Sequence, residues 1–177
     1  MRNSRADVVE AALRVLDEHG LEFCSMRRVA AALDVQPSAL YHHVPNKQSL
    51  LALMADEIVR GVASRGGEHP ASLCRALRQA LLAIRDGADV VATASAFRLG
   101  ASGVEARLTE LVGADGARTL LLYTFGQAQA TQTQLQAHAI GALPNVNPRA
   151  DLAGELAQGF ERGIEIILGG LGAVQRH

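Results

Sequence analysis

Apolar residues recur along most of this chain at the three-to-four-residue spacing of amphipathic helices. The segment from Arg5 to His19 carries its apolar positions on one helical face, at Val8, Val9, Ala12, Leu13 and Leu16. Ser4 stands where a capping side chain would begin this helix. Gly20 stands where a residue of positive φ would end it. The pattern therefore predicts a first helix over residues 5–19.

Two shorter helices are predicted next, joined by a tight turn. The first follows Ser25 and has apolar residues at Met26, Val29, Ala30 and Leu33. Residues 34–35 form the turn. Pro37 fits the first position of the following helix, where its missing N–H is not needed. That helix is expected to stop at Val44, because Pro45 disfavours helical geometry in the residue before it.

The remainder of the chain is predicted to be helical as well. Asn46 can cap a fourth helix, whose apolar face is Leu50, Leu51, Leu53, Met54, Ile58 and Val62. Loops are expected where glycine and proline gather, at residues 65–70 and 141–149. Between and beyond these loops the pattern indicates helices over about 73–84, 88–97, 104–112, 114–138 and 151–171.

Composition supports an all-α fold. Hydrophobic residues make up 49% of the 177 positions while aromatic residues make up only 3%, so leucine, alanine, valine and isoleucine must form the core. Leucine and alanine are strong helix formers, and runs typical of β-strands are scarce. We expect an N-terminal three-helix helix-turn-helix domain over residues 1–46. The fourth helix joins it to a larger helical domain, residues 47–177, for ligand binding and dimerisation.

The charge of the chain limits how it could bind nucleic acid. The formal net charge is −1, so DNA binding would require a local basic patch rather than an overall positive field. Cys24 and Cys74 lack companions at metal-ligand spacing, which predicts reduced thiols and no metal site or cofactor. No signal-peptide or membrane-spanning pattern is present, and we expect a cytoplasmic protein with no membrane partner.

The third predicted helix has the polarity of a DNA-reading helix. Leu40 and Val44 are expected to point inward. The residues left on the outer face are Ser38, Ala39, His42 and His43, with Tyr41 at the margin. A short helix with a compact, uncharged outer face suits the major groove, where small side chains let the backbone approach base edges. Arginines and a lysine before and after this helix can contact phosphates.

Residues 25–53 strongly resemble the DNA-binding domain of the TetR (tetracycline repressor) family. The resemblance rests on the run SMRRVAAALDVQPSALYHHVPNKQSLLAL, with its Leu-Tyr-x-His-Val-x-Asn-Lys segment. The family turn usually carries glycine where this chain has Asp34, and aspartate tolerates left-handed geometry. A looser resemblance extends to the tetracycline-repressor type of C-terminal domain, through Arg85-Asp86-Gly87-Ala88 and the segment from Phe160 to Leu171.

The resemblance implies a role for eight residues in DNA binding. Base edges would be met by Arg27, Pro37, Ser38 and Ala39. Phosphates would be held by Tyr41, His43 and Lys47, with help from Ser25. Two bland alternatives stay open at this point: the side chain of Tyr41 could simply pack, and Pro37 could do no more than begin its helix.

The resemblance also bears on the ligand. Tetracycline repressors hold a magnesium chelate partly through a histidine after the Arg-Asp-Gly-Ala turn, and this chain has Val91 there. A mostly apolar ligand other than magnesium-tetracycline is therefore expected, bound by Val91, Thr93, Phe97, Arg98, Tyr123, Gln127, Thr131 and Gln134. Two alternatives remain: residues 127–136 could be a solvated helix face, and Arg98 could pair with a ligand carboxylate.

The family is dimeric, and the last predicted helix gives a physical reason. It is too apolar for a solvent-facing tail, and Gly159, Gly163 and Gly170 would let another helix approach closely. With the 114–138 helix, the 151–171 helix would form a four-helix bundle in a homodimer. Alternatively, this stripe only covers the core of its own chain. A two-fold dimer would bind a palindromic operator.

These observations together predict a double-stranded-DNA-binding transcriptional repressor, released from its operator by a small-molecule inducer. The main alternative is an activator or constitutive regulator that has no inducer, and a helical protein–protein adaptor with no role on DNA is another. An enzyme is not expected, because the chain has no nucleophile elbow, phosphate loop or zinc-protease motif.

Overall fold

The computed structural model describes residues 4–142 and 151–174, and within them it is all-α, as predicted. Its helices are α1 (Arg5–His19), α2 (Met26–Ala32), α3 (Pro37–Leu40), α4 (Lys47–Ile58), α5 (Val62–Arg65), α6 (Pro70–Leu82), α7 (Gly87–Ala96), α8 (Ser102–Ala139) and α9 (Leu152–Val174). No strand occurs in this part of the chain. Most of the predicted loop at residues 141–149 lies outside the described residues.

Helix α1 begins and ends where the sequence predicts. The Ser4 side chain accepts a hydrogen bond from the backbone N–H of Asp7, and the Asp7 carboxylate accepts one from the backbone N–H of Ser4 at 2.7 Å. These hydrogen bonds to Ser4 lower the pKa of Asp7. Gly20 ends the helix with a φ of 81°.

The helix-turn-helix also forms at the predicted residues, but its second helix is shorter. Ser25 caps α2, Asp34 adopts a left-handed φ of 53°, and Pro37 is the first residue of α3. Regular α-helix stops at Leu40 rather than Val44. The carbonyl of Leu40 accepts hydrogen bonds from the N–H groups of both His43 and Val44, so the chain closes in a turn after Leu40.

Helix α4 ends earlier than the apolar pattern suggests. Asn46 caps it as predicted, accepting a 2.8 Å hydrogen bond from the backbone N–H of Ser49. Gly61 then takes a φ of 72°, and Val62 begins the short α5 instead of extending α4. Leu50, Met54 and Ile58 are buried, so the predicted face does contact the core.

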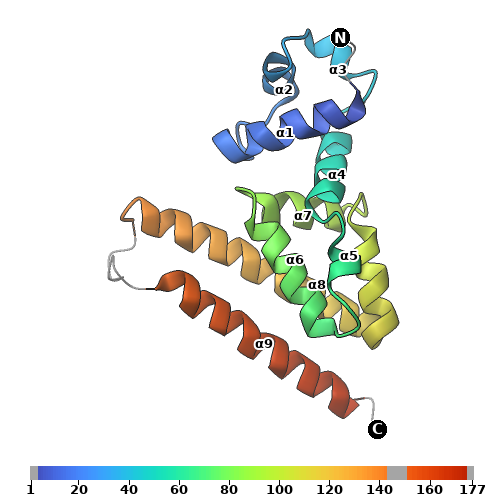
Figure 1. Cartoon of the computed structure of the whole chain (residues 1–177), viewed down its shortest axis with the longest axis vertical. Coiled ribbons are helices and arrows are strands. Elements are labelled where there is room, and N and C mark those ends of the chain that lie inside the picture. The colour runs from blue at the N-terminus through green and yellow to red at the C-terminus, as the bar shows by residue number, and fades with distance from the viewer. Residues whose placement is uncertain (1–3, 143–150, 175–177) are drawn as a thin grey trace.

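Helix α8 is continuous in its bounds but bent at Gly113. This residue has φ 76° and ψ 169°, values that no helix adopts, and it divides the element into the two helices predicted from sequence. The two arms are clear in Figure 1, where the short arm runs steeply and the long arm crosses the molecule.

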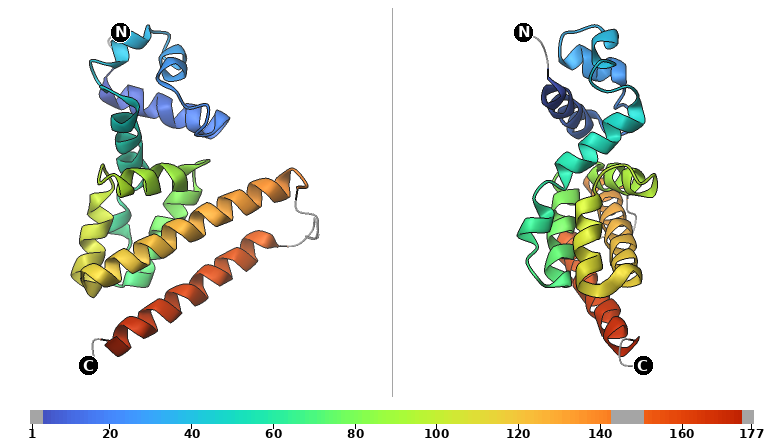
Figure 2. Two further views of the ribbon diagram at one scale, coloured as in Figure 1. Left: turned by 180° about the vertical axis from the view of Figure 1, so that it is seen from behind. Right: turned by 90° about the vertical axis from the view of Figure 1, so that its right-hand side faces the viewer.

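The elements assemble into two ends joined by α4. Helices α1–α3 form one end, while α6, α7 and α8 pack together at the other, and α9 runs antiparallel along the long arm of α8 (Figures 1 and 2). The core is continuous through the joint, because Met54 and Ala55 of α4 are fully buried. Within the described ranges, none of the helices combines the length and apolarity needed to span a bilayer.

Candidate functional site

The outer surface of α3 is small and uncharged. Leu40 and Val44 are buried beneath it, at 1% and 0% exposure, while Ser38 and Ala39 are exposed. Pro37 is half-buried and begins the helix. This division matches the prediction, and it leaves the backbone of α3 accessible to another large molecule.

Side chains that can contact bases or phosphates are exposed in α2, just after α3 and at the start of α4. Arg27, Tyr41 and Lys47 are all exposed, Tyr41 at 52%. None of their side chains makes a hydrogen bond or ion pair within the described part of the chain. Tyr41 therefore does not pack into the core, which was the alternative to a phosphate contact.

The other two predicted phosphate contacts, Ser25 and His43, interact with neighbouring residues of the protein. Ser25 uses its hydroxyl as the cap of α2, accepting from the backbone N–H of Arg28 at 3.3 Å. His43 is half-buried and lies near Asp7 of α1, whose pKa it helps to lower. Arg28 itself lies over the ring of Phe23, with 5.7 Å between the guanidinium carbon and the ring centroid.

The larger helical unit contains a pocket of about 490 Å³ between α7, the α7–α8 loop and both arms of α8. Its apolar wall comes from Ala92, Ala96, Leu121, Leu122 and Phe125. Its polar wall comes from Ser95, Arg98, Ser102, Glu105, Arg118 and Gln129. This volume lies within the range of small-molecule sites.

Most of the predicted ligand-binding residues do not line this pocket. Arg98 does, but Val91 is buried in the core, Thr93 is half-buried beside it, and Phe97 is 64% exposed at the end of α7. The remaining four lie on the side of α8 that is turned away from the pocket, since a helix rotates about 100° per residue. They are Tyr123, Gln127, Thr131 and Gln134.

Three of these four side chains are already bonded inside the protein. The Nε of Arg78 donates to the Oε1 of Gln127 at 2.7 Å, and its Nη2 donates to the Oγ1 of Thr131 at 3.3 Å. The guanidinium of Arg78 also lies over the ring of Phe160, and burial lowers its pKa. The hydroxyl of Tyr123 donates to the carbonyl of Phe160 on α9 at 3.2 Å.

Most glutamines of residues 127–136 in α8 make hydrogen bonds inside the protein, so this segment is not simply a solvated helix face. Gln132 is 9% exposed, and its amide nitrogen donates to the carbonyl of Ile84 at 2.7 Å while its oxygen accepts from the N–H of Ala88. Gln129 donates to Asp89 and Gln136 donates to Asp86. These amides satisfy the backbone and carboxylates at the turn between α6 and α7.

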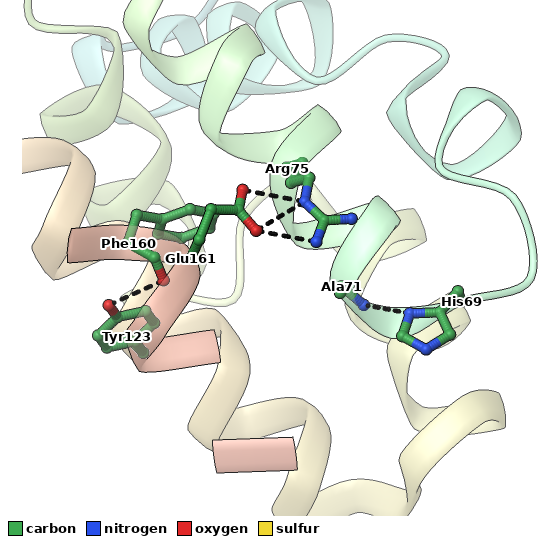
Figure 3. A network of polar contacts seen from close by, with 6 residues as sticks. All are labelled: His69, Ala71, Arg75, Tyr123, Phe160 and Glu161. Atoms are coloured by element: carbon green, nitrogen blue, oxygen red, sulfur yellow. Dashed lines mark hydrogen bonds and ion pairs between the residues drawn. The ribbon is translucent and has the colours of Figure 1, made fainter. Parts of the chain in front are cut away.

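Helix α9 is held to the rest of the domain by charge as well as by apolar packing. Figure 3 shows the carboxylate of Glu161 accepting from Nε and Nη2 of Arg75, both at 2.8 Å, and the hydroxyl of Tyr123 bonded to α9 beside it. The rings of Tyr123 and Phe160 stack with centroids 5.7 Å apart. The close helix approach predicted at Gly163 is therefore made by Tyr123 of the same chain.

The α7–α8 loop connects the pocket to α4. Arg98, Gly100 and Ala101 all have positive φ, of 55°, 79° and 57°. The N–H of Ala101 donates to the carboxylate of Asp56 on α4 at 2.6 Å, and Gly100 lies against the carbonyl of Ala52. A displacement of Arg98 would therefore move Gly100 and Ala101, which contact α4, and α4 leads to the helix-turn-helix.

A second joint lies at the turn between α6 and α7. The carboxylate of Asp86 accepts from the backbone N–H of Leu21 at 2.8 Å and from Gln136 of α8 at 3.1 Å. The backbone N–H of Arg85 donates to Asp17 of α1 at 3.1 Å. One turn thus contacts the N-terminal unit and the long arm of α8 together.

Sequence reasoning missed the aliphatic and basic residues of α8 that form the pocket wall. None of these residues was among the predicted ligand-binding residues, because the local sequence does not indicate which face of the 114–138 helix lines a pocket; they are Arg118, Leu121, Leu122 and Phe125. Only the bend at Gly113, which folds the two arms of α8 around the pocket, brings them together with Glu105.

Comparison with known proteins gives related sequences and folds. Residues 8–54 match the family model described as bacterial regulatory proteins, tetR family. The HTH-type transcriptional repressor DrrR1 of Streptomyces coeruleorubidus is 48% identical over 66 residues, which are 37% of this chain and 23% of that protein. The chain spans less than half the length of the curated relatives that it matches.

Two solved structures align over nearly the whole chain. BioQ in complex with its double-stranded DNA operator has a TM-score of 0.77 and 30% identity, covering 97% of this chain and 99% of BioQ. A possible TetR family transcriptional regulator from Streptomyces coelicolor A3(2) has a TM-score of 0.75 and 33% identity, covering 97% of this chain and all of the other. With the matched helix-turn-helix and this full-length similarity, the chain belongs to the TetR family of bacterial regulatory proteins.

Proposed function

We propose that the chain is a sequence-specific DNA-binding transcriptional repressor. The observation that carries this proposal is the exposed, uncharged face of α3, which lies close in sequence to three exposed side chains: Arg27 of α2, Tyr41 just after α3, and Lys47 of α4. None of the three has a hydrogen-bond or ion-pair partner within the described residues. Base edges are read by Pro37, Ser38, Ala39 and Arg27, while Ser25, Tyr41, His43 and Lys47 hold phosphates. Family membership and the similarity to an operator-bound structure support this assignment.

The test is a binding experiment on DNA selected from a randomised duplex pool. Fluorescence anisotropy would measure the affinity of the wild-type chain for the selected operator and for an unrelated duplex over a range of salt concentrations. Lys47→Ala removes one phosphate contact, so it should weaken both complexes and reduce the salt slope by about one. Ser38→Val should act mainly on the selected operator, at a cost of about 1–3 kcal/mol.

Arg107→Ala provides the matched control, because it removes one positive charge from the first arm of α8, far from the helix-turn-helix. It should leave the salt slope as it is in the wild-type chain. A wild-type chain that selects no preferred sequence would contradict the proposal. So would a Lys47→Ala chain with an unchanged salt slope.

The proposal includes release from DNA by a small, mostly apolar ligand other than magnesium-tetracycline. The pocket of about 490 Å³ supports a ligand-responsive regulator over one without an inducer. Because the α7–α8 loop touches both this pocket and α4, a ligand that prefers one loop arrangement would shift the position of the helix-turn-helix. A ligand that occupies the pocket without changing operator affinity would overturn this part.

A homodimer completes the proposal. The exposed apolar side chain of Ile166 on α9, at 75%, supports pairing of the 114–138 and 151–171 helices with those of a second copy. A two-fold dimer would place two α3 helices on one duplex, which calls for a roughly palindromic operator.

A further inference from the structure

The wall of the pocket between α7 and α8 contains two arginines and one glutamate, which gives it an excess of positive charge. Arg98 enters it from the α7–α8 loop and Arg118 enters it from the long arm of α8. Neither guanidinium makes an ion pair or a side-chain hydrogen bond within the described residues. Glu105 contributes the single carboxylate of the pocket wall, so two positive groups face one negative group.

These two arginines contrast with others in the same domain. Arg75 and Arg107 each contact a glutamate at 2.8 Å, and Arg78 is bonded to two side chains of α8. Arg75 and Arg78 thus use their guanidinium groups to join α6 to α9 and α8, and Arg107 pairs within α8. Among the described residues, no such partner is found for the two arginines that line the pocket.

The backbone at Arg98 adds a second observation. Its φ of 55° is a conformation that a residue other than glycine rarely adopts. Gly100 and Ala101 follow at φ 79° and 57°, so this loop has three positive-φ residues, and its charged side chain has no hydrogen-bond or ion-pair partner within the described residues. Such strain is typical of positions where the surrounding structure fixes a side chain for binding.

The rest of the wall is suited to a hydrocarbon group. Leu121, Leu122 and Phe125 form one side of the pocket, and alanines of α7 form the other. A ligand with an apolar body would be covered by these side chains, and an acidic head would lie with the two guanidinium groups. Arginine binds carboxylates well because its planar N–H groups match the two oxygens.

We propose that this pocket binds an amphipathic organic anion, with Arg98 and Arg118 holding its carboxylate and the α8 wall covering its apolar body. The proposal rests on the ligand-responsive function proposed above, and it specifies the chemical class of that ligand. It also assigns Glu105 a role in selectivity, because its carboxylate repels a second acidic group and keeps the net charge of the pocket low.

The test uses three probes of one skeleton that differ only in charge: 4-phenylbutyrate, 4-phenylbutanol and 4-phenylbutylamine. Isothermal titration calorimetry on the full chain should show the acid binding at least tenfold more tightly than the alcohol, and the amine binding least. Arg98→Gln/Arg118→Gln should remove the preference for the acid, whereas Arg98→Lys keeps the charge and should retain it. Glu105→Gln should tighten binding of the acid.

Arg107→Gln is the matched control, since this arginine lies on the same helix but outside the pocket wall. It should leave the order of the three probes unchanged. The proposal is overturned if the alcohol binds the wild-type chain as tightly as the acid, or if the acid shows no binding at millimolar concentration. These results need no variant, so a folding defect in the double variant cannot obscure them.

Operator binding measured beside the titration separates this inference from the proposed function. Binding of the acid without loss of operator affinity supports the pocket assignment and contradicts release by ligand. Preference for the neutral alcohol, together with loss of operator affinity, contradicts the anion assignment and leaves the repressor function standing.

Discussion

Single residues with positive φ control the loops on which the site depends. Asp34, Asp86, Arg98 and Ala101 all adopt left-handed backbone although none is glycine. Each of them stands at a junction: the helix-turn-helix turn, the α6–α7 turn, and the start and end of the loop beside the pocket. The backbone cost at these positions is repaid by contacts that join one helical unit to the next.

Substitutions at Gly100 and Ala101 should have opposite effects on stability. A Cβ at Gly100 would lie 2.7 Å from the carbonyl oxygen of Ala52 at a φ of 79°, so Gly100→Ala should lower the free energy of unfolding by about 2–4 kcal/mol. Ala101→Gly relieves a φ of 57° and should raise it by up to about 1 kcal/mol. Urea denaturation followed by circular dichroism measures both, and equal effects would contradict this reading of the loop.

The thiol of Cys74 should make the protein less stable at alkaline pH. Burial raises the pKa of Cys74 from about 9 to about 11. Between these values the folded state holds a proton that the unfolded state has lost, so stability is intact below pH 9 and falls as the pH rises toward 11. Urea midpoints at pH 8 and pH 10.5 should differ less in Cys74→Ala than in the wild-type chain. An identical pH dependence in the two chains would refute the assignment.

At the scale of elements, several ends of helices could be predicted from nearby residues, whereas the packing of one helix against another could not. The start of α1 at Ser4, the start of α3 at Pro37 and the bend at Gly113 could all be predicted, because capping groups and backbone freedom act within a few residues. The early end of α4 was not predicted, since the apolar pattern continues past Gly61 into α5.

The candidate ligand pocket was harder to predict than the candidate DNA-binding face, because a pocket depends on which helices pack together and not on local sequence alone. The exposure of Ser38 and Ala39 follows from the period of a short helix, and both are exposed in the structure, whereas the sequence left the packing of Tyr41 open. The glutamines of α8 could equally have faced water, a ligand or another helix. Their amides are used by α6, α7 and α9, which approach from distant parts of the sequence.

The packing of α9 on α8 should depend on the absence of a side chain at Gly163. A Cβ there would overlap the ring and hydroxyl of Tyr123, so Gly163→Ala should lower the free energy of unfolding by about 1–3 kcal/mol. Gly172→Ala is the control on the same helix, because no described atom lies near its Cβ, and it should be neutral or slightly stabilising. Thermal unfolding compares the two, and similar midpoints would show that α9 tolerates a displacement of Tyr123.

At the scale of the whole molecule, two joints connect the N-terminal unit to the larger domain. One is α4 itself with its contact to the α7–α8 loop, and the other is Asp86 at the turn between α6 and α7. At each joint a carboxylate accepts a backbone hydrogen bond, Asp56 from Ala101 and Asp86 from Leu21, beside a continuous apolar core. The two ends of the molecule are therefore expected to unfold as one unit.

Asp86→Gly should weaken that coupling. Glycine suits the φ of 54° at this position, so the substitution removes only the carboxylate that accepts from Leu21 and Gln136. Hydrogen exchange should show faster exchange at the Leu21 amide. Unfolding should be easier by about 1–3 kcal/mol, the range for hydrogen bonds to a charged group. Unchanged protection at Leu21 would show that its N–H has another acceptor.

Ile166→Glu should convert a dimer into monomers. The side chain is 75% exposed on α9, and a carboxylate there would be buried without a partner in the proposed interface. Sedimentation velocity should show half the mass of the wild-type particle. Leu99→Glu, which changes an exposed apolar residue outside α8 and α9, should sediment as the wild-type chain does. A wild-type chain that is itself monomeric would contradict the interface.

The shortness of α3 sets a limit on the information that one copy can extract from a genome. The helix spans only Pro37–Leu40, and Leu40 is buried, so few side chains can reach base edges. Singling out one site among about 10⁶ competitors requires roughly ten specified base pairs, since each pair has four identities. A helix this short can distinguish only a few base pairs. In the proposed dimer, recognition of a single genomic site would therefore depend on both copies, and a ligand that changes the distance between their α3 helices would abolish this recognition without altering any residue that contacts the bases.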